Sequence, residues 1–167
     1  ERTTYSVLSD LNPPKIDELK SDNSIVSKDL YRYLQLPQNL NPKFDALSRE
    51  IIQDAKAQNN YDKAKAIETY LQTKLSYSLE MKASGDDPLA DFLFNVKAGH
   101  CEYFASSMAI MLRTQGIPTR IVNGFQSGEY NETVGMWIVR QSDAHSWVEV
   151  YFPDKKVWAT FDPTPAT

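Results

Sequence analysis

The stretch that decides the fold is residues 97–118, which read KAGHCEYFASSMAIMLRTQGIP. After Gly99, apolar residues recur at intervals of three and four, the pattern of a helix with one face in a protein core. The members of that stripe are Phe104, Ala105, Met108, Met111 and Leu112. Gly116 and Pro118 then supply a cap residue and a residue that cannot extend the helix. The stretch therefore predicts a long, buried helix that begins near Cys101.

Cys101, the only cysteine of the chain, falls in the first turn of this helix. The first turn has amide donors without helical partners and carries a partial positive charge, and both favour a thiolate over a thiol. A lone cysteine more often fills space in a core. Helix position alone leaves both interpretations, nucleophile and packing residue, open.

Composition excludes several classes of protein. A chain of 167 residues, with 41% apolar and 24% charged residues, can form one globular domain with its own core. A net charge of −4 gives no reason to expect nucleic acid as a partner. No apolar run approaches the roughly 18 residues that a membrane span needs. One cysteine excludes an internal disulfide.

The chain divides into two parts by patterning. Residues 1–30 carry turn-forming residues and little periodicity, so we expect a lead-in segment or linker there. Residues 31–167 carry the periodic segments and form the expected domain. The chain opens on Glu1 rather than methionine, and we interpret it as a segment of a longer protein.

Helical patterns come first and strand patterns second, which predicts an α+β fold. Residues 42–55 and 62–74 have helical periodicity and are expected to form an antiparallel pair that supports the Cys101 helix. Residues 77–81 are expected to be extended, and 89–94 to form a short helix. After Pro118, short runs rich in β-branched and aromatic residues predict an antiparallel sheet of about four strands. Those runs are 120–125, 136–140, 144–152 and 157–161.

The third and fourth runs bring an imidazole and a carboxylate together. Alternation places His145 and Trp147 on one face of the third strand. A four-residue turn pairs Phe152 with Val157, and a two-residue turn pairs it with Lys155. Either register puts His145 and Asp162 on the same face, directly opposite or one diagonal apart, whereas a three-residue turn would put them on opposite faces. A carboxylate there can orient the imidazole and leave its other nitrogen for a thiol.

Other interpretations remain open on spacing alone. His145 is also compatible with a hydrogen-bonded core histidine, and Asp162 with a cap on the turn at Pro163. His100 adjoins Cys101, and neighbours on a helix point about 100° apart, which makes it a poor general base. The spacings typical of zinc sites are absent, so no metal is expected.

Three blocks of the sequence resemble the transglutaminase-like superfamily. The first is Gly99-x-Cys101-Glu102-Tyr103-Phe104-Ala105 with Leu112-Arg113-x-x-Gly116-Ile117-Pro118-x-Arg120. The second is Val122-x-Gly124-Phe125 with Asp143-Ala144-His145-x-Trp147-Val148-Glu149-Val150, and the third is Phe161-Asp162-Pro163-Thr164. The order also matches, with 44 residues from Cys101 to His145 (145 − 101) and 17 from His145 to Asp162 (162 − 145).

The resemblance implies a papain-like α+β fold with Cys101 as nucleophile, His145 as base and Asp162 as its orienting partner, and no cofactor or metal. It implies acyl transfer at protein or peptide amide bonds, by transamidation or hydrolysis. A cysteine peptidase of the cell envelope and a non-catalytic binding module are the alternatives. Residues 141–145 and the YLQLP run at 33–37 are most like the extracytoplasmic domain of bacterial membrane proteins, so we expect a periplasmic or extracellular domain of a protein anchored through segments outside this chain.

Two further expectations concern the surroundings of the site. Tyr77 is a candidate second oxyanion donor, although a packing role is the commoner one for a tyrosine. The three tryptophans, Trp137, Trp147 and Trp158, and the polar loop at 126–134 are candidates for the border of a substrate groove.

Overall fold

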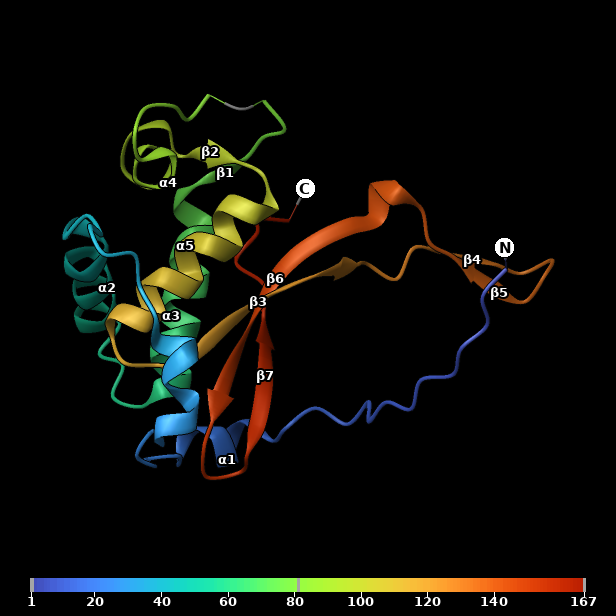
Figure 1. Cartoon of the computed structure of the whole chain (residues 1–167), viewed down its shortest axis with the longest axis horizontal. Coiled ribbons are helices and arrows are strands. Elements are labelled where there is room, and N and C mark those ends of the chain that lie inside the picture. Colours follow the sequence, from blue (N-terminus) through green and yellow to red (C-terminus); the bar gives the residue numbers. More distant parts are fainter. Residues whose placement is uncertain (1, 81, 167) are drawn as a thin grey trace.

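The computed structural model describes residues 2–80 and 82–166, and it shows a helical half packed on an antiparallel sheet (Figure 1). The helical elements are α1 (Ile16–Lys20), η1 (Lys28–Leu34), α2 (Lys43–Asp54), α3 (Asn60–Lys74), α4 (Pro88–Asp91), η2 (Phe92–Val96), α5 (Cys101–Thr114) and η3 (Gln141–Asp143). The strands are β1 (Ser76–Tyr77), β2 (Ala98–Gly99), β3 (Thr119–Phe125), β4 (Glu129–Asn131), β5 (Met136–Ile138), β6 (Ala144–Phe152) and β7 (Val157–Phe161). The α+β prediction is confirmed.

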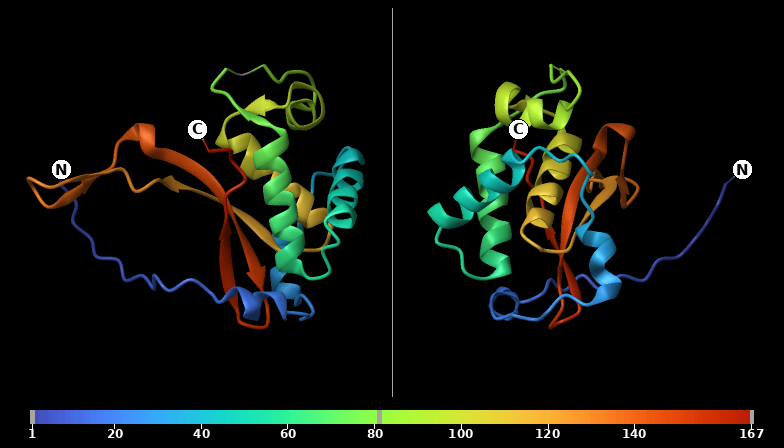
Figure 2. Two further views of the ribbon diagram at one scale, coloured as in Figure 1. Left: turned by 180° about the vertical axis from the view of Figure 1, so that it is seen from behind. Right: turned by 60° about the vertical axis from the view of Figure 1, so that its left-hand side comes forward.

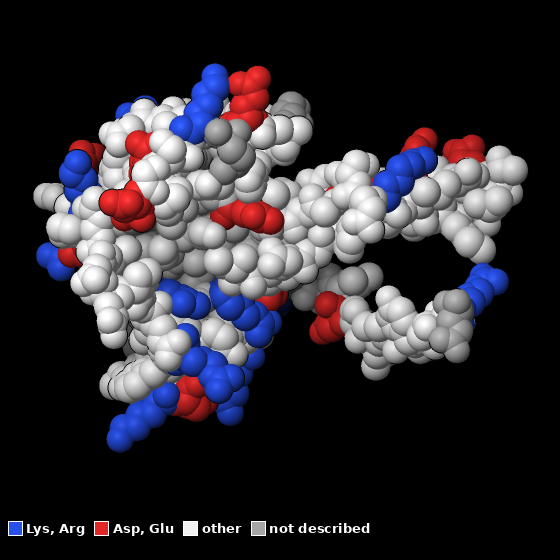
Figure 3. Space-filling model, turned by 45° about the horizontal axis from the view of Figure 1, so that its top comes forward, with Lys and Arg blue, Asp and Glu red and all other residues white. Residues whose placement is uncertain are grey.

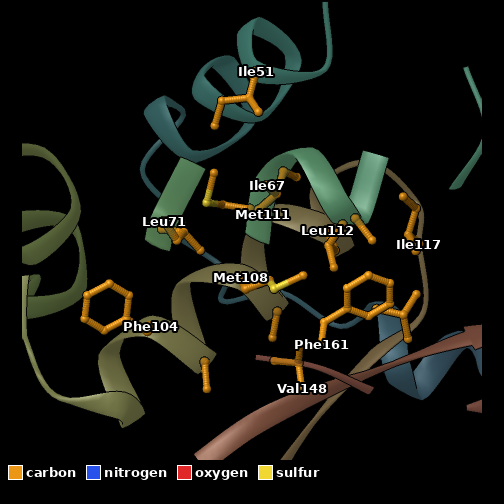
Figure 4. Packing of buried hydrophobic residues seen from close by; sticks show 14 of the residues in the cluster. Ile51, Ile67, Leu71, Phe104, Met108, Met111, Leu112, Ile117, Val148 and Phe161 are labelled. Atoms are coloured by element: carbon orange, nitrogen blue, oxygen red, sulfur yellow. The ribbon is translucent and has the colours of Figure 1, made fainter. Parts of the chain in front are cut away.

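Helix α5 lies at the centre of the core, as its apolar stripe predicts. It packs against α2 and α3 on one side and against β6 and β3 on the other. Figure 4 shows Met108 and Met111 of α5 between the helices and the sheet, with Ile67 and Leu71 of α3 above and Val148 of β6 below. All five side chains are fully buried. This two-sided burial fixes the direction of α5 and therefore the place of its first residue.

The sheet has the strand order β3-β6-β7, with β6 paired antiparallel to both neighbours. Phe152 is paired with Val157 and Val148 with Phe161, so of the two predicted registers the structure has the one with the four-residue turn. Burial alternates along β6: Ser146, Val148, Val150 and Phe152 are buried, and the residues between them are partly exposed. The alternation turns one face of the sheet toward α5.

The expectation of a sheet of about four strands was wrong in one strand. Met136–Ile138 pairs with Glu129–Asn131 to form a separate β4–β5 hairpin, which projects from the body (Figures 1 and 2). Figure 3 shows the hairpin standing clear of the molecule, with much of its surface uncharged. Its local pairing brings Tyr130 against Trp137, with ring centroids 5.4 Å apart. β4 is polar, so its sequence has no apolar run that predicts a strand. Because β5 pairs with β4, it does not join the main sheet.

Two further expected elements differ from their predictions. β1 includes only Tyr77 of the extended segment predicted at 77–81 and pairs in parallel with β2, while Met81, at the end of that segment, lies outside the described residues. The expected helix at 89–94 is divided into α4 and a π-helical turn, η2. Within residues 2–80 and 82–166, no helix has the length and apolarity required to cross a bilayer.

Candidate active site

Cys101 is the first residue of α5 and is partly buried. His100 precedes it in extended conformation and provides no side-chain cap for the helix. The Tyr103 amide donates to the His100 carbonyl, so the first-turn donors available to a negatively charged group are the amides of Cys101 and Glu102. The predicted position of the cysteine at a helix start is confirmed.

His145 and Asp162 are joined directly. His145 Nε2 lies 2.7 Å from Asp162 Oδ2, and the imidazole is largely buried while the carboxylate is half-exposed. The carboxylate accepts from Nε2–H, which leaves Nδ1 as the free ring nitrogen. The register of β6 and β7 places these two side chains together, as the sequence predicts.

The chain holds Asp162 at each of its polar groups. Its Oδ1 accepts a hydrogen bond from the amide of Thr164, and its Oδ2 is bonded to His145. Its backbone amide donates to Glu68 Oε2 and its backbone carbonyl accepts from Gln72 Nε2. Sequence reasoning missed Glu68 and Gln72, because polar residues on an amphipathic helix carry no local signal of a distant partner.

Trp147 packs beside the imidazole. Its ring is stacked on that of His145 at a centroid distance of 6.1 Å and an angle of 23°. Gly124, which pairs with His145 across the sheet, provides the space: a Cβ there would lie 2.8 Å from Trp147 Cη2. The aromatic ring thus restricts the orientation of the imidazole from one side.

A cavity of about 820 Å³ lies beside the His145–Asp162 pair. Its polar lining includes Gln72, Tyr77, Gln126, Ser142 and Thr164. Tyr77 faces this space as a partly exposed residue, in a strand paired with the β2 residues that precede Cys101. Gln126, at the start of the predicted polar loop, lies at the border of the cavity, while the rest of the loop extends into the hairpin.

Cys101 is not among the residues that line this cavity, and the structure relates it to the His145–Asp162 pair only through the position of its helix. The N-terminal end of α5 lies next to the segment after β7 in all three ribbon views (Figures 1 and 2). Among the residues that the structure describes, Cys101 Sγ forms no hydrogen bond. His100, the other histidine, instead packs edge-to-face on Tyr103.

The other predicted features have structural positions of their own. Trp158 packs with Tyr33 and Tyr151 and lies under the guanidinium of Arg120, 4.0 Å from the ring centroid. Trp137 is exposed on the hairpin. Within the described parts of the chain, no three His, Cys, Asp or Glu side chains are grouped so as to hold a metal ion.

Comparison with known proteins identifies relatives. A 39% identical relative over 143 residues is a protein-glutamine gamma-glutamyltransferase of Pseudomonas aeruginosa, with 86% of this chain and 21% of the relative covered. Another, 38% identical over 172 residues, is the uncharacterized protein YebA of Bacillus subtilis, with 96% of this chain and 23% of the relative covered. The chain thus spans less than a quarter of the length of these relatives.

Among solved structures, the periplasmic domain of TgpA from Pseudomonas aeruginosa superimposes with a TM-score of 0.73 at 37% identity. The match covers 84% of this chain and 48% of that domain, so the chain spans about half of it. The family model of the transglutaminase-like superfamily matches residues 45–163, which include Cys101, His145 and Asp162. The chain belongs to the transglutaminase-like superfamily.

Proposed function

We propose that this chain catalyses thiol-dependent acyl transfer at protein carboxamide groups, with Cys101 as nucleophile, His145 as base and Asp162 as the group that orients His145. The hydrogen bond of 2.7 Å between His145 and Asp162 carries the proposal, because it orients the imidazole and leaves Nδ1 free to accept a proton. Membership of a superfamily with a glutamyltransferase relative supports the same chemistry.

The first half of the reaction forms a thioester. His145 Nδ1 accepts the thiol proton, and Cys101 Sγ attacks the carboxamide carbon. The carbonyl oxygen becomes an oxyanion, for which the uncapped amides at the start of α5 are suitable donors. The C–N bond then breaks, the imidazolium gives its proton to the leaving amine, and ammonia departs. Asp162 stabilises the imidazolium through Nε2–H.

The second half of the reaction decides the product. A primary amine that attacks the thioester gives a new amide and regenerates the thiol, with His145 transferring the proton. Water in place of the amine gives a carboxylate. We propose transamidation as the main outcome, on the support of the glutamyltransferase relative, and hydrolysis by a peptidase or deamidase as the alternative.

Mass spectrometry of a glutamine-containing acceptor protein, such as dimethylated casein, tests the proposal. The acceptor is incubated with a primary amine and either the wild-type chain or Cys101→Ala. We expect the mass of the amine, less that of ammonia, to be added only with the wild type. Cleavage of the acceptor, or a Cys101-dependent gain of about 1 Da per glutamine, would instead identify a hydrolase.

Alkylation of the single cysteine separates both enzymes from a binding module. Iodoacetamide should label Cys101 faster than it labels the denatured chain at neutral pH, and His145→Ala should remove the advantage. Equal rates in the native and denatured chains, with no change of the acceptor, would contradict the proposal and favour a binding module.

We also propose that the chain acts outside the cytoplasm as a domain of a membrane-anchored protein, on a protein or peptide substrate. The match to a periplasmic domain supports this location. Protease accessibility of this domain in intact spheroplasts expressing the parent protein tests it. Protection until the membrane is lysed would contradict an extracytoplasmic location.

A further inference from the structure

We infer that Glu68 and Gln72 of α3 are positioning residues that hold Asp162 in place for His145. The role rests on the proposed function, in which Asp162 orients the base. These two residues contact the backbone of Asp162 from a helix far away in the sequence, and neither touches His145 in the hydrogen bonds of the described residues.

The two contacts are complementary. Residues four apart lie on the same face of a helix, so Glu68 and Gln72 present their side chains together. The Glu68 carboxylate accepts from the Asp162 amide at 2.9 Å, and the Gln72 amide donates to the Asp162 carbonyl at 2.7 Å. One acceptor and one donor therefore match the one amide and one carbonyl of a single residue.

Asp162 needs such support because it lies beyond the last strand residue. β7 ends at Phe161, so the ladder to β6 does not continue through Asp162, and Pro163 follows with no amide hydrogen. Among the hydrogen bonds of the described residues, the one other backbone group bonded to Asp162 is the amide of Thr164, which donates to Oδ1. Without α3, the carboxylate would lie on an irregular segment beyond the end of β7.

Glu68 is buried, so its carboxylate depends on protein partners rather than on water. The residue is only 5% exposed, and a buried carboxylate is costly unless it is paired and hydrogen-bonded. Its second oxygen lies 2.6 Å from Lys65 Nζ, and this hydrogen bond raises the pKa of Lys65. Glu68 thus links Lys65 at the surface to the backbone of Asp162, the residue whose carboxylate contacts His145.

Gln72 is the better residue to test, because it is exposed and lines the cavity beside His145 and Asp162. Gln72→Ala removes the donor, and Gln72→Glu keeps the shape but sets a carboxylate against the Asp162 carbonyl. Thr73→Ala is the matched control, since Thr73 is exposed on the same helix and, among the described residues, its hydroxyl donates to the Thr69 carbonyl alone. None of the three changes is expected to unfold the domain.

The experiment combines proton NMR of the histidine ring with steady-state kinetics. The chain has only two histidines, so the ring N–H signal of His145 is assigned with His100→Gln. We expect both Gln72 variants to shift this signal or broaden it by exchange. Their kcat for amine incorporation should fall about tenfold while KM changes less than about twofold, because positioning acts on the reacting geometry and not on binding. Thr73→Ala should match the wild type in all three readouts.

A ring signal and kcat equal to those of Thr73→Ala in both Gln72 variants would overturn the inference. A fall in kcat with an unmoved ring signal would also overturn it, since the effect would then not pass through His145. The ring signal can be measured without turnover. If the wild-type chain shows no transamidation but the Gln72 variants still displace the His145 signal, the positioning role is upheld and the proposed function alone is contradicted.

Discussion

At the scale of single residues, the site depends on close contacts that tolerate little change of volume. Gly124 lies under the Trp147 ring, and the ring stacks on His145. A methyl group on residue 124 would overlap Trp147 Cη2 at 2.8 Å and force the ring toward or away from the imidazole. The identity of a glycine on β3 is therefore linked to the geometry of a histidine on β6.

We expect Gly124→Ala to lower the free energy of unfolding by about 1–3 kcal/mol, the usual cost of overpacking. Urea denaturation measures it. The same change made in a Trp147→Leu background should cost clearly less, because the overlapping ring atoms are gone. Equal costs in the two backgrounds would show that Trp147 is not the group that excludes the methyl.

At the scale of elements, the β4–β5 hairpin differs from the rest of the sheet half in having its own pairing and no share of the core. None of the buried core residues among the described residues comes from it. Val134, Met136 and Trp137 are each more than half exposed. The base of the hairpin is held separately, by the amide of Gln126 donating to the carbonyl of Asp143.

Replacing residues 129–138 by a short Gly-Ser link should change Tm by less than about 2 °C, since little buried apolar surface is lost. Differential scanning calorimetry checks this. Shortening the β6–β7 turn at 153–156 by one residue is the comparison, because it disturbs the register that pairs Phe152 with Val157. A loss of stability on hairpin removal as large as that of the comparison would contradict the expectation.

At the scale of the whole molecule, part of the segment before residue 31 contributes to the core. α1 packs on α3, and Leu19 is 2% exposed and belongs to the core cluster. Asp22 is buried as well, and its Oδ2 accepts from the amide of Asp154 in the β6–β7 turn. We therefore propose that the folded domain begins near residue 16, and that residues 2–15 alone serve as a lead-in.

Leu19→Ala should lower the free energy of unfolding by about 2–5 kcal/mol, the range for removing a buried leucine side chain. Leu8→Ala is the matched control, since the same atoms are removed from a fully exposed side chain. The control should leave stability within about 0.5 kcal/mol of wild type. Urea denaturation of both variants measures the two changes. Equal stabilities of Leu19→Ala and Leu8→Ala would mean that Leu19 lies outside the folded domain.

Local patterns were sufficient for the elements near the site. The 3.6-residue stripe of α5, the stop at Gly116 and the alternation of β6 are written in consecutive residues, so the helix and strands follow from the sequence. The pairing of His145 with Asp162 also follows, because the length of one turn sets the register of β6 and β7. The β4 strand escaped prediction because Glu129–Asn131 has no apolar alternation.

The sequence by itself determined the α+β order, the place of Cys101 at a helix start, and the neighbourhood of His145 and Asp162. Three features were decided by the tertiary structure alone. Glu68 and Gln72 of α3 are hydrogen-bonded to the backbone of Asp162, Leu19 is part of the core, and β5 pairs outside the main sheet. The physical reason is the range of the interactions. Periodicity and turn length act between residues close in the chain, whereas a hydrogen bond from α3 to the segment after β7 exists only once the helices have packed on the sheet.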